Sequence, residues 1–209
     1  MARLAVFDLD GTLVDSLDDL HASVNHALGA VGLPLRTRDE VRGFVGEGAR
    51  VLVAKAVAPR DELFDPALAA WRAHYEAHCL DRTRAYPGIE ALLAGAGRIL
   101  GVHTNKPGAM ARKILAGLGL LPRFAAVVGG DDAPRKPDPT GLQEIMARVG
   151  ASPAETVLVG DSQHDVEAAR AAGAAIVAVT WGLTSRAGLA AAGATVFADT
   201  AADLAPWVA

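Results

Sequence analysis

The feature that most constrains the fold is an alternation of short apolar runs with helical stretches along residues 88–209. The apolar runs are unbroken rather than interrupted by polar residues, which is typical of strands buried on both faces of a parallel sheet. This alternation predicts an α/β fold, a Rossmann-like parallel sheet core with helices on both faces. We expect strands at 99–104, 125–128, 156–160, 176–180 and 195–198, and helices at 89–94, 109–118, 139–149 and 166–172.

A first apolar run, residues 4–7, stands apart from the others, because the next expected strand begins only at residue 99. Up to about residue 82, the chain between them has apolar residues at helical spacing. We therefore expect this block to be an insertion into the first connection between strands. The prediction is an α/β core of residues 1–15 and 83–209 that carries an all-helical cap domain of residues 16–82.

Helix-start signals divide the inserted block. Ser16 with Asp19, and Thr37 with Glu40, have the spacing of capping boxes. Two more helices are expected at 48–57 and from Asp65-Pro66 onward. The fourth helix carries the aromatic residues Trp71 and Tyr75, which we interpret as core packing of a small bundle.

Composition excludes several classes of protein. The chain has 209 residues, of which 51% are hydrophobic, enough for one sizeable core and a small accessory domain. Its net charge of −4 gives no basic field for nucleic acid or anionic lipid. The single cysteine fits a reducing compartment, and no apolar stretch is long enough to span a bilayer. We expect a cytoplasmic monomer or small homo-oligomer with no nucleic-acid or membrane partner.

Two carboxylates follow the first apolar run directly. Asp8 and Asp10 are two positions apart, so a strand would present both on the same face, and Gly11 permits a tight turn after them. Two like charges this close repel unless a cation or a shared proton relieves them. Oxygen ligands of this kind suit Mg²⁺. The ordinary alternative is a polar turn at the end of a strand.

Further polar residues follow the other expected strands. Ligands of open parallel sheets bind beyond the carboxyl ends of the strands, so these side chains are expected to converge on the acidic turn. Each has an ordinary alternative: a turn residue, a solvated loop lysine, a helix cap or a surface carboxylate. The candidates are Thr104, Asn105, Lys136, Asp161 and, one helical turn later, Asp165.

In order and spacing these motifs resemble the haloacid dehalogenase superfamily of phosphohydrolases. The matching segments are DLDGTLVDS at 8–16, TNK at 104–106, KPDP at 136–139 and GDSQHD at 160–165. The helical insertion after the first motif is similar to the helical cap of that family. Within the superfamily, FVGEGAR at 44–50 and VTWG at 179–182 resemble phosphoglycolate phosphatases.

The resemblance implies a Mg²⁺-dependent phosphatase that acts on a small phosphorylated metabolite, 2-phosphoglycolate above others, through an aspartyl-phosphate. It implies that Asp8 is the nucleophile and Asp10 the general acid and base. Asp8, the backbone carbonyl of Asp10 and Asp161 are then the expected metal ligands. Thr104 and Lys136 are expected to contact the phosphoryl group, and Asp165 to orient Lys136 or a metal-bound water.

The cap is expected to inspect the leaving group. Gly43, Gly46 and Gly48 make a flexible loop, and Arg50, which follows it, could pair with a substrate carboxylate. The ordinary alternative for Arg50 is a solvated arginine on a cap helix. The expected substrate-binding residues are Thr104, Asn105, Lys136, Gly46 and Arg50.

Other functions remain open on the same scaffold. A phosphatase of sugar phosphates or nucleotides would use the same chemistry, as would a phosphomutase. A phosphonatase would need a cap lysine able to form a Schiff base, and Lys55 is the only lysine in the inserted block. A non-catalytic binding module is disfavoured, because it would be expected to have lost at least one of the catalytic groups.

Overall fold

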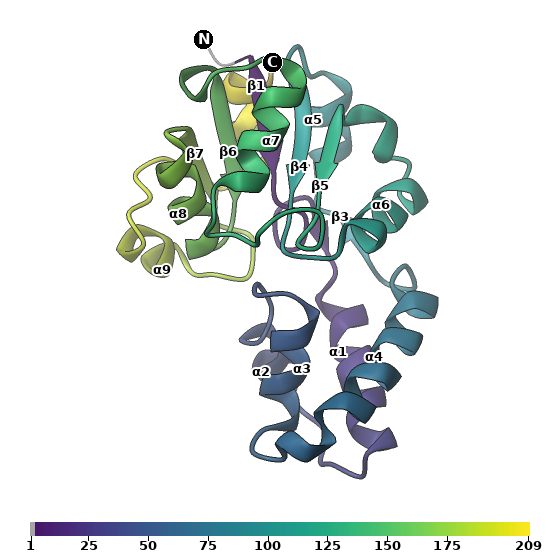
Figure 1. Ribbon diagram of the computed structural model, residues 1–209. Helices are drawn as coiled ribbons and strands as arrows, with labels where there is room; N and C mark the ends of the chain where they lie inside the picture. The colour runs from purple at the N-terminus through teal and green to yellow at the C-terminus, as the bar shows by residue number, and fades with distance from the viewer. Residues whose placement is uncertain (1–2) are drawn as a thin grey trace.

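The fold is built around a parallel sheet of six strands, which confirms the predicted α/β class (Figure 1). The computed structural model describes residues 3–209. The sheet has its first strand in the middle, hydrogen-bonded in parallel to two strands that are distant in sequence. Across the sheet the strands are β5 (Ala126–Val128), β4 (Ile99–His103), β1 (Leu4–Phe7), β6 (Thr156–Gly160), β7 (Ala175–Val179) and β8 (Phe197–Ala198).

Helices cover both faces of this sheet. Successive side chains of a strand point to opposite faces, and in β1 Leu4 and Val6 pack on one side while Ala5 and Phe7 pack on the other. The first face is covered by α7 (Thr140–Val149) and α8 (Gln163–Ala172), the second by α5 (Ile89–Ala94), α6 (Gly108–Gly117) and α10 (Ala205–Val208). The remaining short helices are α9 (Arg186–Ala191), η1 (Asp61–Leu63), η2 (Leu121–Arg123), η3 (Pro153–Glu155) and η4 (Ala201–Leu204).

A helical cap region lies beyond the carboxyl end of β1 (Figure 1). The chain enters and leaves it through a two-stranded antiparallel ribbon, β2 (Val14–Asp15) with β3 (Arg84–Ala85), which the sequence did not predict. We propose that the chain divides at this ribbon into the core and cap domains. The cap helices are α1 (Leu17–Ala30), α2 (Arg38–Arg42), α3 (Ala49–Val57) and α4 (Phe64–His78). Among residues 3–209, no helix combines the length and the apolar character needed to cross a membrane.

One of the two predicted capping boxes forms and the other does not. Thr37 and Glu40 make the reciprocal hydrogen bonds at the start of α2. The prediction for Ser16 and Asp19 is wrong, because each side chain bonds to a partner outside the first turn of α1. The Ser16 hydroxyl donates to the Asp10 carboxylate. The buried Asp19 carboxylate accepts hydrogen bonds from the backbone N–H groups of Arg82 and Thr83 and from the Thr83 hydroxyl.

These contacts of Asp19 tie the first cap helix to the segment that returns to the core. We expect Asp19→Ala to lower the free energy of unfolding by about 3 kcal/mol, because it leaves buried N–H donors without an acceptor. The measurement is urea denaturation followed by circular dichroism. Asp18→Ala is the matched control, since the Asp18 side chain is half-exposed and its ion-pair partner among residues 3–209 is the equally exposed Arg38, and it should change stability little. Equal losses in the two variants would contradict this role of Asp19.

Candidate active site

The carboxyl ends of three adjacent strands bring the candidate residues together. Asp8 follows β1, Thr104 follows β4 and Asp161 follows β6, and β1 lies between the other two. Lys136 enters from the loop between β5 and α7, and Asp165 from the first turn of α8. All five side chains are buried. The convergence expected at this edge of the sheet is therefore observed.

Lys136 forms the centre of this group. Its ammonium lies 2.8 Å from a carboxylate oxygen of Asp8 and 2.7 Å from one of Asp165, and it donates to the His103 carbonyl at 2.9 Å. Burial alone would lower the pKa of this lysine, but the charges of Asp165 and Asp8 outweigh burial and raise it. Lys136 is thus a charged, immobilised cation beside the Asp8 carboxylate.

Asp165 has both carboxylate oxygens engaged within the protein. Oδ1 accepts from Lys136, and Oδ2 accepts from the backbone N–H and the hydroxyl of Ser162. Ser162 and Asp165 thereby form the capping box that begins α8. This arrangement orients Lys136 and fixes the start of the helix in the same contact.

Asp161 occupies a space that glycines leave free. Its oxygens accept from the Thr12 hydroxyl at 2.9 Å and from the Leu183 N–H at 2.7 Å. A Cβ on Gly11 would lie 2.2 Å from an Asp161 oxygen, and a Cβ on Gly182 would lie 2.3 Å from the Asp161 Cβ. Gly11 also has a φ of +85°, which a side chain would disfavour. The acidic turn therefore approaches Asp161 closely because it contains glycine.

The buried carboxylates carry more negative charge than the protein itself balances. Burial, then the charges of Asp8 and Asp165, raise the pKa of Asp161 to about 8. Burial also raises the pKa of Asp8 to about 6, against the opposing effect of Lys136. Oxygens of Asp8, Asp161 and Asp165 lie within 4.8 Å of one another. The raised pKa values show that these carboxylates lack enough nearby positive charge to ionise easily. A hard divalent cation bound to their oxygens would supply that charge.

Asp10 faces a different way from this cluster, toward the cap. One of its oxygens lies 3.1 Å from the Lys106 ammonium and also accepts from the Ser16 hydroxyl. The side chain stays partly accessible, at 14% of its surface. Asp10 thus presents a carboxylate to the space between core and cap, where a bound molecule could exchange a proton with it.

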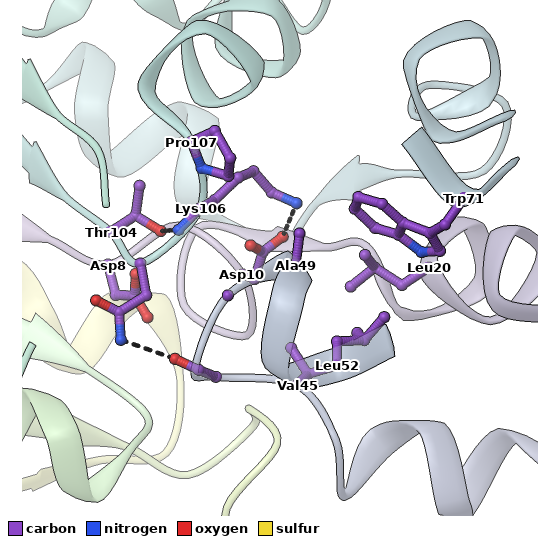
Figure 2. A pocket seen from close by; sticks show the side chains of 13 residues that line it. Asp8, Asp10, Leu20, Val45, Ala49, Leu52, Trp71, Thr104, Lys106 and Pro107 are labelled. Atoms are coloured by element: carbon purple, nitrogen blue, oxygen red, sulfur yellow. Dashed lines mark hydrogen bonds and ion pairs between the residues drawn. The ribbon is translucent and has the colours of Figure 1, made fainter. Parts of the chain in front are cut away.

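A small cavity of about 50 Å³ lies between the core and the cap (Figure 2). This volume holds roughly a few water molecules, so the site suits a small ligand. The core side is polar and includes Asp8, Asp10 and Thr104. The cap side is mostly apolar and is made by Leu20, Val45, Gly46, Gly48, Ala49, Leu52 and Trp71.

Asn105 joins the cap to the loop that carries Lys136. Its amide donates to the Gly46 carbonyl at 2.9 Å and to the Lys136 carbonyl at 3.1 Å, and its oxygen accepts from the Lys136 N–H at 2.8 Å. These contacts use the Asn105 side chain to position its neighbours. Gly46 and Asn105 both line the cavity.

The structure does not bring Arg50 to the cavity. Helix α3 begins after Gly48, and its first turn places Ala49 and Leu52 toward the cavity. Arg50 is exposed, and its guanidinium lies 4.9 Å from the centre of the Phe64 ring. The spacing of the glycine loop to Arg50 could not reveal this, because it leaves the rotation of the helix undetermined.

The sequence did not indicate a role in the site for three of the residues found there. Lys106 and Ser16 both contact Asp10, and Trp71, interpreted as core packing, is buried but also lines the cavity. Lys106 had a usable signal, since it follows Thr104 at the end of a strand. Ser16 lies in the same motif as Asp10, but its spacing to Asp19 suggested a helix cap instead. Trp71 had no signal, because the residues that complete the cavity lie on distant segments.

Comparison with known proteins agrees with this geometry. A family model for haloacid dehalogenase-like hydrolases matches residues 5–179. A phosphoglycolate phosphatase of Rhodospirillum rubrum is 41% identical, covering 100% of this chain and 91% of the relative. A phosphoglycolate phosphatase of Pseudomonas aeruginosa is 38% identical, covering 99% and 79%. The crystal structure of a predicted phosphoglycolate phosphatase from Haemophilus somnus superposes with a TM-score of 0.93 at 33% identity, covering 99% and 97%. The chain belongs to the haloacid dehalogenase-like hydrolases.

Proposed function

We propose that this protein is a Mg²⁺-dependent phosphatase that hydrolyses 2-phosphoglycolate to glycolate and phosphate through an aspartyl-phosphate. The observation that carries the chemistry is the placement of Asp8, held by Lys136, and Asp10 on the wall of one small cavity. The relatives named phosphoglycolate phosphatase, 41% and 38% identical, support the substrate.

Asp8 is the proposed nucleophile. One of its oxygens accepts from the Leu9 N–H at 2.7 Å and lies 2.8 Å from the Lys136 ammonium. These contacts fix the plane of the carboxylate at the cavity wall. Attack on phosphorus forms the bond from Asp8 to phosphorus and breaks the bond from phosphorus to the glycolate oxygen.

Asp10 is the proposed general acid and base. It protonates the glycolate oxygen as that oxygen leaves, and then takes a proton from the water that attacks the phosphorus of the aspartyl-phosphate. The second step releases phosphate and restores the Asp8 carboxylate. Ser16 and Lys106 hold Asp10 at the boundary of core and cap, where both proton transfers would take place.

Thr104 and Lys136 are the proposed ligands of the phosphoryl group. The Thr104 oxygen accepts from the Lys106 N–H at 3.2 Å, so its own hydrogen is free to donate to a phosphoryl oxygen. Lys136 supplies a fixed positive charge, held by Asp165 and the His103 carbonyl. Such preorganised charge stabilises the transferring group without any rearrangement during the reaction.

Asp8, Asp161 and the backbone carbonyl of Asp10 are the proposed ligands of Mg²⁺. A bound divalent cation would neutralise charge on the nucleophile and the phosphoryl group and so lower their repulsion. Asp165, with both oxygens engaged, acts by holding Lys136.

A phosphonatase function has less support. Lys55, the lysine in the cap region, pairs with Glu47 at 2.6 Å, has a 39% exposed side chain and does not line the cavity. It therefore offers no amine to a substrate held beside Asp8.

The test of the proposed function is kcat/KM across phosphate monoesters that include 2-phosphoglycolate, sugar phosphates and nucleoside monophosphates. We expect 2-phosphoglycolate to be preferred by at least about tenfold, because the cavity is small. EDTA should abolish turnover and Mg²⁺ restore it, whereas Ca²⁺, which prefers a larger and looser shell, should support it poorly. A preference for a sugar phosphate would refute the substrate while keeping the chemistry, and full activity in EDTA would refute the metal.

Replacing the proposed acid should separate the two halves of the reaction. We expect Asp10→Asn to slow 2-phosphoglycolate hydrolysis by about 10²- to 10⁴-fold, the usual contribution of a general acid or base. A burst of p-nitrophenolate should still appear from p-nitrophenyl phosphate, because that leaving group needs no protonation. An unchanged steady-state rate for 2-phosphoglycolate would remove Asp10 from proton transfer.

The raised pKa values of Asp161 and Asp8 link stability to pH and to metal. Without a divalent cation, the folded chain holds protons that the unfolded chain has released above about pH 4, the usual pKa of Asp. This contribution to stability is therefore lost as pH rises toward about 8. Mg²⁺ binds the ionised carboxylates, so the rise in Tm that it causes should grow between pH 5 and 8.

Thermal denaturation with and without Mg²⁺ measures this effect. Asp161→Asn should flatten the pH dependence and remove most of the shift in Tm caused by Mg²⁺. Asp18→Asn, at an exposed site on the cap, is the control and should behave as the unchanged protein. A Mg²⁺ shift of the same size in Asp161→Asn would exclude Asp161 as a ligand.

A further inference from the structure

Lys106 is the one lysine or arginine among residues 3–209 that lines the cavity. Lys136 pairs with Asp8 and is not among the residues that line the cavity, and Arg50 is turned outward onto Phe64. Every other lining residue is acidic, a neutral polar residue or apolar. An anionic group on a leaving group bound there would therefore find its positive partner in Lys106.

The surroundings of Lys106 hold its charge in place and leave one donor over. The side chain is buried, at 7% exposure; its ammonium donates to the Tyr75 hydroxyl at 2.8 Å and lies 3.1 Å from the Asp10 carboxylate. It also lies 4.6 Å from the centre of the Tyr75 ring. An ammonium has three protons, and these two polar partners account for two of them. The third is available to a ligand.

Trp71 supplies a second observation on the same cavity. The Trp71 ring stacks on Tyr75 at 4.9 Å between centres, and Tyr75 is the residue that holds Lys106. In Figure 2 Lys106 extends from the core toward the cap side chains Trp71 and Leu20. Lys106 and the aromatic part of the cavity wall thus belong to one connected cluster.

We propose that Lys106 binds the carboxylate of the substrate. This inference rests on the proposed function, because it assumes that the leaving group carries a carboxylate. In phosphoglycolate one methylene separates the carboxylate carbon from the ester oxygen that Asp10 must protonate. Lys106 lies 3.1 Å from Asp10, so it is placed on the leaving-group side at the reach of that carboxylate.

The proposal also accounts for size selection. The leaving group would lie against Trp71, Leu20 and Leu52, which the cap contributes and which give this side of the cavity an apolar wall. A sugar or nucleoside in this position would have to displace those side chains and leave its hydroxyls without hydrogen bonds. Lys106 and the apolar wall therefore act together to favour a short, acidic leaving group.

The test compares 2-phosphoglycolate with 2-hydroxyethyl phosphate, which replaces the carboxylate by a neutral alcohol. The quantity measured is the ratio of the two kcat/KM values. Any effect of Lys106 on the chemistry through Asp10 acts on both esters and cancels in this ratio. We expect Lys106→Met to lower the ratio by about ten- to a hundredfold, as the loss of a charge-assisted hydrogen bond would.

Two further variants serve as comparisons. Lys113→Met removes an exposed lysine whose ammonium donates to the Glu76 carbonyl, and should leave the ratio unchanged. Arg50→Met tests the competing assignment and should also leave it unchanged. If Lys106→Met does not fold, Lys106→Gln provides the same comparison with a neutral polar side chain.

The outcomes separate the inference from the function on which it rests. If the unchanged protein prefers 2-phosphoglycolate and Lys106→Met keeps that preference, or loses both esters equally, the inference is wrong and the function stands. A ratio that falls in Arg50→Met but not in Lys106→Met would overturn the inference in favour of Arg50. If the unchanged protein shows no preference for 2-phosphoglycolate, the proposed substrate fails and the inference fails with it.

Discussion

The site depends on one buried cation, the ammonium of Lys136 between the carboxylates of Asp8 and Asp165. Burial of three charged groups is costly, and the arrangement persists because each charge has close partners. The second oxygen of Asp165 accepts a hydrogen bond from Ser162 at the start of α8. Lys136 also donates to the carbonyl of His103, at the end of β4. The cation therefore joins β1, β4 and α8 at one point, so the nucleophile is positioned by the same contacts that close this edge of the core.

Two kinds of contact extend this order to the cap. The Asn105 side chain hydrogen-bonds to the Gly46 carbonyl of the cap and to the backbone N–H and carbonyl of Lys136. It therefore fixes the position of the cap loop relative to Lys136, the residue that pairs with Asp8. Lys106 connects Asp10 with Tyr75 of α4. The nucleophile and the acid are thus each linked to the cap by a neighbouring residue of the same strand end. A change in cap position would therefore move the surroundings of both Asp8 and Asp10. Closure of a cap can in this way exclude water and complete a catalytic site in the same step.

The sequence predicted the elements whose cause is local. The strands at 4–7 and 156–160 have the predicted bounds, because unbroken apolar runs end there at acidic turns. The strand expected at 195–198 covers only Phe197–Ala198, at the edge of the sheet where fewer neighbours define it. The β2–β3 ribbon is two residues long on each side and carries no pattern. Ser16 and Asp19 have the spacing of a capping box, yet Ser16 binds Asp10 in the preceding turn and Asp19 binds Thr83, which is distant in sequence.

The positions of Arg50 and Lys106 show the same limit at the site. Both are cations at the end of a predicted motif, but the rotation of α3 and the packing of α4 decide which one reaches the cavity. A helix face is fixed by what it packs against, and the apolar residues Ala49 and Leu52 take the inner face of α3, which sends Arg50 outward. Lys106 stays inside because Tyr75 and Asp10 offset the cost of its burial. The cation that lines the cavity therefore lies beside Asp10, the proposed general acid, and a leaving group protonated by Asp10 would be within reach of Lys106.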